Sequence, residues 1–200
     1  YHLSRLKAAG AIPDLPIFLN SPMAADATDI YRAHPEAHRL SAADYEALRS
    51  VAKVVNSVEE SRSLDASPWP KVIVSASGMA TGGRVLHHLK TYAPDARNTV
   101  LFVGFQAMGT RGASMLAGAP AIKMFGEYIP VRAEIVNLTS LSSHADYQEI
   151  LTWLGAFRRP PQMTYVTHGD PVAADAMRLH VEETLHWRCR VPEHLETVRW

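Results

Sequence analysis

The chain has 200 residues, of which 47% are hydrophobic and 20% are charged, as in an ordinary globular protein. Its 20 basic and 20 acidic residues balance, which excludes a globally positive surface, so any site for a polyanion has to be local. The only cysteine, Cys189, excludes an intrachain disulfide and favours a reducing, cytoplasmic location. No hydrophobic run reaches membrane-spanning length, so we expect no membrane partner.

The first segment, residues 1–9, has the pattern of an amphipathic helix that is already under way at Tyr1. Gly10 is a typical residue to follow a helix C-terminus. We therefore expect the chain to be a fragment of a longer protein.

Residues 16–105 alternate between hydrophobic runs and amphipathic segments. Strands are predicted at residues 16–20, 54–58, 71–76 and 99–105, and helices at residues 23–32, 41–51 and 84–92. Ser21 and Ser41 are predicted N-caps, and Pro22 is the predicted first helical residue. We interpret the acidic residues of this region as solvated or capping groups: Asp26, Glu59, Glu60 and Asp65. Strand, crossover helix and strand in this order predict an α/β fold with a parallel, Rossmann-like sheet flanked by helices.

The second half of the chain breaks this rhythm. A short helix is predicted at residues 109–118, and a hairpin at residues 121–131 that turns near Gly126. After the hairpin we predict strands at residues 133–138 and 162–167 and helices at residues 143–157 and 172–185. Extended pieces are predicted at residues 188–191 and 196–200. The hairpin predicts a subdomain boundary at roughly residues 120–135.

A glycine-rich segment joins the predicted strand at residues 71–76 to the next helix, with the sequence Ser-Ala-Ser-Gly-Met-Ala-Thr-Gly-Gly-Arg. Glycines there let backbone N–H groups face an anion, and the helix N-terminus adds positive potential. The candidate phosphate-binding residues are Ser75, Gly78, Gly82, Gly83 and Arg84. The alternative is a turn whose glycines only let the helix pack tightly on the sheet.

Two histidines follow predicted strands, whereas the neighbouring pair His87 and His88 lies within a helix, on different sides, and is less promising. Histidines at consecutive strand ends can converge on one metal or phosphate. The two are His144 in Ser-Ser-His-Ala-Asp and His168 in Thr-His-Gly-Asp-Pro, with Ser143, Asp146 and Asp170 as supporting residues. The structural alternative is that Ser143 and Asp146 only cap a helix that has His144 in its first turn, and that Asp170 only caps the next helix.

In this order, the segments resemble the β-CASP branch of the metallo-β-lactamase superfamily. That branch consists of RNA nucleases such as RNase J and the endonuclease of the pre-mRNA cleavage and polyadenylation machinery. The resemblance rests on residues 20–24, 58–61, 75–90, 103–112, 142–146 and 166–171. It implies that residues 1–125 are most of a β-CASP domain and that residues 130–200 are the returning end of the metallo-β-lactamase domain, an RNA-specificity segment.

The resemblance further implies a zinc-dependent hydrolase that cleaves phosphodiester bonds of single-stranded RNA during RNA processing or decay. In the family, the histidine that His168 matches is a zinc ligand, and the one that His144 matches lies beside the scissile phosphate as a proposed general acid. Two zinc ions are expected in the intact enzyme, where they activate a hydroxide and neutralise phosphate charge.

Two departures from the family pattern are visible. The motif at His168 continues as Gly-Asp, where many relatives have Gly-Glu. More importantly, no His-x-His-x-Asp-His motif is present, and that motif supplies most of the family's zinc ligands. We therefore expect the remaining ligands in an N-terminal metallo-β-lactamase portion of the same protein, and we expect the 200-residue chain alone to bind no zinc and to be inactive.

Two other functions stay open. The chain is alternatively a non-catalytic RNA-binding or assembly module of the same family, or part of a hydrolase of small phosphoesters, against which the β-CASP-type segment argues. The sequence does not distinguish endonucleolytic from exonucleolytic cleavage, and it leaves a homodimer open.

Overall fold

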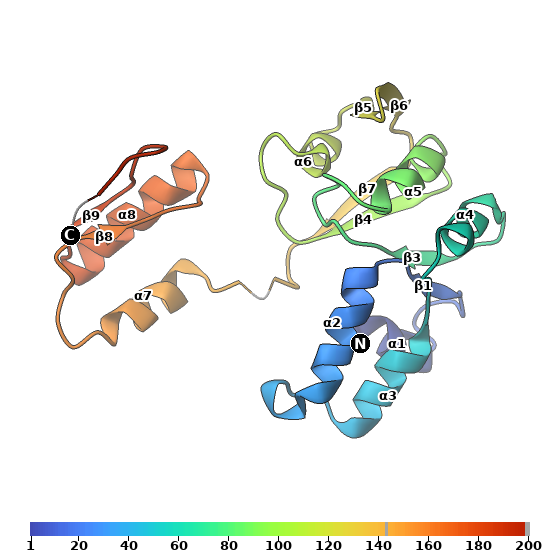
Figure 1. The fold of residues 1–200 in the computed structure, drawn as a ribbon, viewed down its shortest axis with the longest axis horizontal. Coiled ribbons are helices and arrows are strands. Elements are labelled where there is room, and N and C mark those ends of the chain that lie inside the picture. The colour runs from blue at the N-terminus through green and yellow to red at the C-terminus, as the bar shows by residue number, and fades with distance from the viewer. Residues whose placement is uncertain (143, 199–200) are drawn as a thin grey trace. The chain divides into compact units, whose positions relative to one another are not determined.

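The computed structural model describes residues 1–142 and 144–198, which form two compact units, Tyr1–Ser140 and Leu141–Trp200 (Figure 1). The first unit contains the helices α1 (His2–Ala8), α2 (Pro22–Ala33), η1 (Pro35–Ala37), α3 (Ala42–Val51), α4 (Val58–Ala66), α5 (Val85–Tyr92) and α6 (Arg111–Leu116). Its strands are β1 (Ile17–Leu19), β2 (Ala52–Val54), β3 (Val72–Val74), β4 (Thr99–Val103), β5 (Ala121–Met124), β6 (Glu127–Pro130) and β7 (Glu134–Leu138).

Parallel strand pairing confirms the predicted α/β class. The strands β2, β1 and β3 form a parallel sheet in that order, and β4 pairs in parallel with β7. Leu19 is in register with both Val54 and Val74, so these three strands end at the same level. The residues that follow them, including Asn20, therefore meet at one edge of the sheet.

Local capping explains where several helices begin. Ser21 caps α2 by accepting a hydrogen bond from the N–H of Ala24, and Ser41 forms a capping box with Asp44, as predicted. Glu60 forms the equivalent box at the start of α4, which confirms its predicted capping role. These caps anchor the helices that cross between the parallel strands.

The core of the first unit lies among β4, β7, α5, α6 and the hairpin formed by β5 and β6. Its buried residues are Ala80, Leu86, Leu89, Phe102, Met115, Ile122, Met124 and Ile129. Full burial of one large hydrophobic side chain contributes about 1.5–3 kcal/mol, so this cluster stabilises the unit. The hairpin was predicted from the sequence, and it turns at Gly126 with a φ of +83°.

The strand β7 pairs with β4 and belongs to the first compact unit, although the sequence-based boundary had grouped residues 133–138 with the second domain. Ile135 of β7 packs against the first unit's core. The hydrophobic pattern of a strand shows that it is buried but not which strand it pairs with, so the sequence alone could not place β7.

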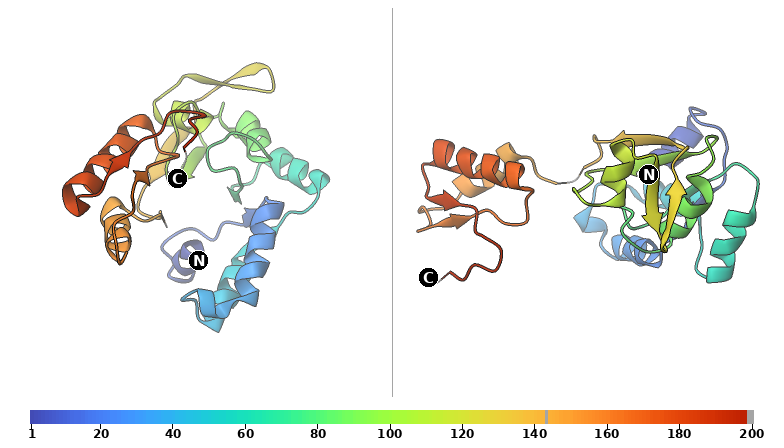
Figure 2. Two further views of the ribbon diagram at one scale, coloured as in Figure 1. Left: turned by 60° about the vertical axis from the view of Figure 1, so that its left-hand side comes forward. Right: turned by 90° about the horizontal axis from the view of Figure 1, so that it is seen from above.

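The second unit consists of α7 (Tyr147–Gly155), β8 (Thr164–Tyr165), α8 (Pro171–Leu185) and β9 (Cys189–Arg190). In the right-hand view of Figure 2, α8 runs along the parallel pair of β8 and β9. A separate small core holds the unit together, with the buried residues Leu154, Val181, Trp187 and Cys189. Burial raises the pKa of the Cys189 thiol above its ordinary value, because the thiolate would lose its hydration.

The helix predicted at residues 143–157 begins later than expected. Asp146 is its N-cap and forms a capping box with Glu149, so Tyr147 is the first helical residue. The structural alternative that His144 is a first-turn residue of this helix is therefore wrong, and its candidate cap Ser143 lies outside the described residues. An Asp with a Glu three residues later satisfies two terminal N–H groups, which explains why the helix starts here.

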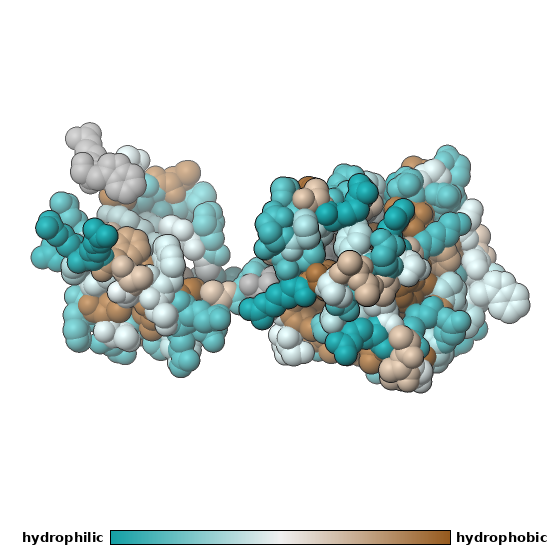
Figure 3. Space-filling view, turned by 90° about the horizontal axis from the view of Figure 1, so that it is seen from below, coloured by the Kyte–Doolittle hydropathy of each residue, from teal (hydrophilic) through white to brown (hydrophobic). Residues whose placement is uncertain are grey.

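Hydrophobic side chains also reach the surface of each unit. On the face drawn in Figure 3 they alternate with hydrophilic ones. None of the helices in the described part of the chain combines the length and the apolar character that a membrane crossing requires.

Candidate functional site

The glycine-rich segment, residues 75–84, forms the connection between the carboxyl end of β3 and the start of α5. Within it, the N–H of Ala80 donates to the carbonyl of Ser77 at 3.0 Å. The N–H groups of Gly78, Thr81, Gly82, Gly83 and Arg84 have no hydrogen-bond acceptor among the described residues. A run of unpaired donors next to a helix N-terminus is suited to an anion.

The glycines of this segment occupy two kinds of structural environment. Gly83 has a φ of +77°, a conformation in which other residues are strained. At Gly78 and Gly82 an added Cβ would meet nothing within 4 Å. Tight packing of the helix on the sheet therefore does not explain Gly78 and Gly82, and they instead leave the backbone open to a ligand.

Ser75 and Arg84, both half-buried, are engaged within the protein. The Ser75 hydroxyl donates to the carbonyl of Asn20 at 3.0 Å and to that of Ala76 at 3.1 Å. The Arg84 guanidinium donates from Nη1 to Asn20 Oδ1 at 2.7 Å and to the carbonyl of Val55 at 2.9 Å, and from Nη2 to the carbonyl of Asn56 at 2.7 Å. Arg84 thus ties the segment to the ends of β1 and β2. Its Nε–H and one Nη2–H have no acceptor among the described residues, and the predicted phosphate contact remains a prediction that concerns these two groups.

A buried polar network continues from Arg84 through Asn20, which is fully buried. Asn20 Nδ2 lies 2.7 Å from Ser61 Oγ and 2.7 Å from His88 Nε2. His88 Nδ1 lies 2.6 Å from Asp65 Oδ1. The network therefore joins the end of β1 to α4 and α5.

The direction of each hydrogen bond in this network follows from Arg84, because a guanidinium can only donate. The atom of Asn20 that it contacts is therefore the carbonyl oxygen, and the amide nitrogen faces His88 and donates to Nε2. His88 consequently carries its proton on Nδ1 and donates it to the Asp65 carboxylate. Next to this network, burial and the charge of Asp65 raise the pKa of Tyr92 to about 12, and its hydroxyl donates to the carbonyl of Leu64 at 2.8 Å.

Sequence reasoning missed this network. Asp65 was interpreted as a solvated or capping residue, but it is largely buried, with 18% of its side chain exposed, and paired with His88. His88 was judged less promising than the other histidines, yet it is the buried member of its pair, while His87 is exposed and stacks on Phe125. One signal was available: Ser61 and Asp65 are four residues apart on α4 and therefore share a face of that helix.

The two histidines of the predicted metal or phosphate site are exposed residues of the second unit. His144 precedes α7, and its N–H donates to Ser142 Oγ at 3.2 Å. His168 follows β8 with a φ of +65°, and Asp170 occupies the N-cap position of α8 without a side-chain capping bond. β7 pairs with β4 while β8 pairs with β9, so strand pairing does not bring the two histidines to one edge, and their convergence remains a prediction.

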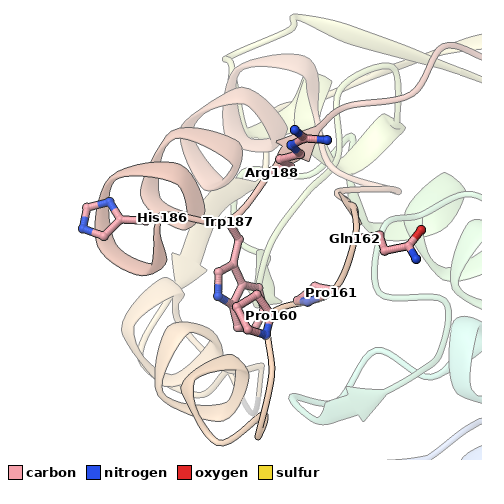
Figure 4. A pocket seen from close by; sticks show the side chains of 6 residues that line it. All are labelled: Pro160, Pro161, Gln162, His186, Trp187 and Arg188. Atoms are coloured by element: carbon pink, nitrogen blue, oxygen red, sulfur yellow. The ribbon is translucent and has the colours of Figure 1, made fainter.

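An open depression of about 400 Å³ also exists in the second unit, lined by Pro160, Pro161, Gln162, His186, Trp187 and Arg188. Figure 4 shows the Trp187 ring beside Pro160, while the side chains of His186, Gln162 and Arg188 point away from one another. No group of polar side chains converges on it, so its geometry suggests no chemistry.

Comparison with known proteins decides the family. Residues 1–115, more than half of the chain, match the family model described as the Beta-Casp domain. The chain belongs to the β-CASP family. Residues 128–192 of this β-CASP chain match a second model, described as the Zn-dependent metallo-hydrolase RNA specificity domain.

Named relatives support the same assignment. The β-CASP chain is 38% identical to Ribonuclease TTHA0252 of Thermus thermophilus over 72% of this chain and 35% of the relative. It is 31% identical to Transcription termination factor FttA of Methanosarcina mazei over 95% of this chain and 32% of the relative, and 31% identical to FttA of Pyrococcus abyssi over 95% and 31%. The chain thus spans about a third of the length of these relatives.

The described residues of the β-CASP chain do not make a zinc site by themselves. No three His, Cys, Asp or Glu side chains among residues 1–142 and 144–198 lie close enough together to hold a metal ion. Structural zinc needs four protein ligands and catalytic zinc usually three, so one candidate ligand, His168, does not fit zinc without further ligands.

Proposed function

We propose that this chain is the RNA-holding part of a zinc-dependent ribonuclease of the β-CASP family. The observation that supports it most is that five backbone N–H groups, those of Gly78, Thr81, Gly82, Gly83 and Arg84, have no acceptor among the described residues. RNA phosphates supply acceptors of the right charge, and a helix N-terminus adds favourable potential. The match to an RNA specificity domain and the similarity to a ribonuclease favour RNA over other polyanions.

Residues of the second unit have proposed roles that depend on the rest of the protein. We propose His168 as a zinc ligand and His144 as the general acid near the scissile phosphate, with Asp146 capping the helix that follows His144 and Asp170 as a supporting residue beside His168. The other zinc ligands would come from an N-terminal metallo-β-lactamase portion. The single, reduced Cys189 supports our proposal of a cytoplasmic location.

Replacing Gly82 with valine tests the proposed phosphate contact. We expect the affinity for a labelled single-stranded RNA to fall by about 1.5–3 kcal/mol, since the added side chain stands where a phosphate would meet the backbone donors. The melting temperature should stay nearly unchanged, because a Cβ at Gly82 meets nothing within 4 Å. Fluorescence anisotropy of the full 200-residue chain measures this affinity.

Gly155 offers a matched control for the Gly82 variant. It also has open space around an added Cβ, but it is the last residue of α7, far along the chain from the glycine-rich segment. Gly155→Val should bind RNA as the unchanged chain does. If Gly82→Val also binds normally while remaining folded, the backbone of this segment does not hold phosphate.

The alternative is a non-catalytic module that binds RNA or assembles with partners, including a second copy of itself. One observation favours it: two relatives that match 95% of this chain are named transcription termination factors. The two functions differ in the parent protein. A ribonuclease requires the His-x-His-x-Asp-His ligands upstream, and replacing His168 should then abolish zinc-dependent cleavage.

A further inference from the structure

The loop between β4 and α6 carries two prominently exposed hydrophobic side chains. Phe105 is 64% exposed and Met108 is 76% exposed. Exposing a phenyl ring to water is unfavourable. A clustered exposure of this kind in a loop at a strand end is typical of a binding surface.

This loop is fixed directly against the glycine-rich segment. Gln106 Nε2 donates to the carbonyl of Gly78 at 2.9 Å, and the N–H of Gly112 donates to the carbonyl of Met79 at 3.1 Å. Arg111 Nη1 donates to the carbonyls of Ala80 at 3.2 Å and Thr81 at 3.3 Å. Four hydrogen bonds thus hold this loop and the first turn of α6 against the glycine-rich segment, at the carboxyl ends of β3 and β4.

Charge at this paired surface favours a polyanion. Residues 75–85 and 104–112 contain two arginines, Arg84 and Arg111, and no Asp or Glu. The N–H groups of Gly78, Thr81, Gly82, Gly83 and Arg84, which have no acceptor in the described part of the chain, belong to the same pair of segments. An apolar protein segment that covered Phe105 would also bury these donors without acceptors, at about 1–3 kcal/mol for each donor. A nucleotide presents a flat base to the ring and phosphate oxygens to the donors, so it satisfies both.

We propose that Phe105 is a stacking platform for a nucleobase of the RNA strand whose phosphate is held by the glycine-rich segment. This inference rests on the proposed function and adds a base subsite to it. Stacking on an aromatic ring accepts any base, so the subsite would strengthen binding without setting a sequence.

The test measures the Kd of a fluorescein-labelled oligoadenylate for the full 200-residue chain by anisotropy at several salt concentrations. Phe105→Ala should weaken binding roughly 5- to 100-fold, as the loss of one stacked base does. Phe105→Tyr should restore most of the affinity because it keeps the ring, whereas Phe105→Leu should not. The salt dependence of binding should be the same for all of these variants, because no phosphate contact is removed.

Trp69 provides a matched control, since it is 75% exposed but precedes β3, at the opposite end of that strand from the loops. Trp69→Ala should bind RNA as the unchanged chain does. If Phe105→Ala binds normally, or if Phe105→Leu binds as well as Phe105→Tyr, stacking at Phe105 is refuted while RNA binding by the chain stands. If the unchanged chain binds no RNA, the proposed function fails for these residues and the base subsite fails with it.

Discussion

Replacing Asn20 with alanine is expected to lower the free energy of unfolding of the first unit by about 2–6 kcal/mol, since the buried side chains of Ser61 and His88 each lose a partner at about 1–3 kcal/mol. Asn20 is fully buried, and its side chain bonds Arg84, His88 and Ser61. An alanine side chain can make none of these hydrogen bonds. Arg84 Nη1 keeps only the carbonyl of Val55, and His88 Nε2 keeps no partner in the network.

Hydrogen exchange followed by mass spectrometry during urea titration measures this loss for each unit separately. Peptides from the first unit should lose protection at lower urea in Asn20→Ala, while peptides from Leu141–Trp200 serve as an internal reference. Asn56→Ala is the matched variant, because Asn56 is exposed and contributes only its backbone carbonyl to Arg84. Equal stability of the two variants would show that the buried network contributes little.

Replacing Arg84 with alanine is expected to reduce both stability and RNA affinity. Three hydrogen bonds from a charged donor disappear, and the buried carbonyl oxygen of Asn20 is left without its partner, which costs about 2–4 kcal/mol of stability. RNA affinity should fall by about 1–3 kcal/mol if Arg84 also contacts phosphate. Arg84→Lys should recover little stability, because one ammonium group does not reproduce the guanidinium fork.

Salt dependence separates the two roles of Arg84. Loss of a phosphate contact lowers the slope of log K against log salt by about 0.7 for single-stranded RNA. Under conditions in which the variant stays folded, an unchanged slope with a lowered melting temperature would show that Arg84 only shapes the segment. A changed slope would support a direct contact through its remaining N–H groups.

Much of the fold was predictable from local patterns. The hydrophobic runs gave β1 and β3, and the serines at positions 21 and 41 marked the helix starts that the structure has. Pairing was not predictable, because alternation of side chains does not specify which strands become neighbours. The pairing of β7 with β4, across 30 intervening residues, is the clearest example, since β4 ends at Val103 and β7 begins at Glu134.

The candidate site was predictable only in part. The glycine-rich segment stood out because several glycines at a strand-to-helix connection point to exposed backbone donors. The contacts of Arg84 with carbonyl groups could not be predicted from the sequence, because its partners Asn20 and Val55 lie 64 and 29 residues away in sequence. A guanidinium that suits phosphate also suits protein carbonyls, and sequence does not distinguish the two.

Whether this chain can hold catalytic zinc by itself is tested most directly by incubating it with labelled single-stranded RNA and zinc and measuring cleavage. We expect RNA binding but no zinc-dependent cleavage above the buffer control, since His168 is its only predicted zinc ligand and the described residues form no metal site. Zinc-dependent turnover that His168→Ala abolishes would contradict the account, because it would mean that the chain contains a complete metal centre.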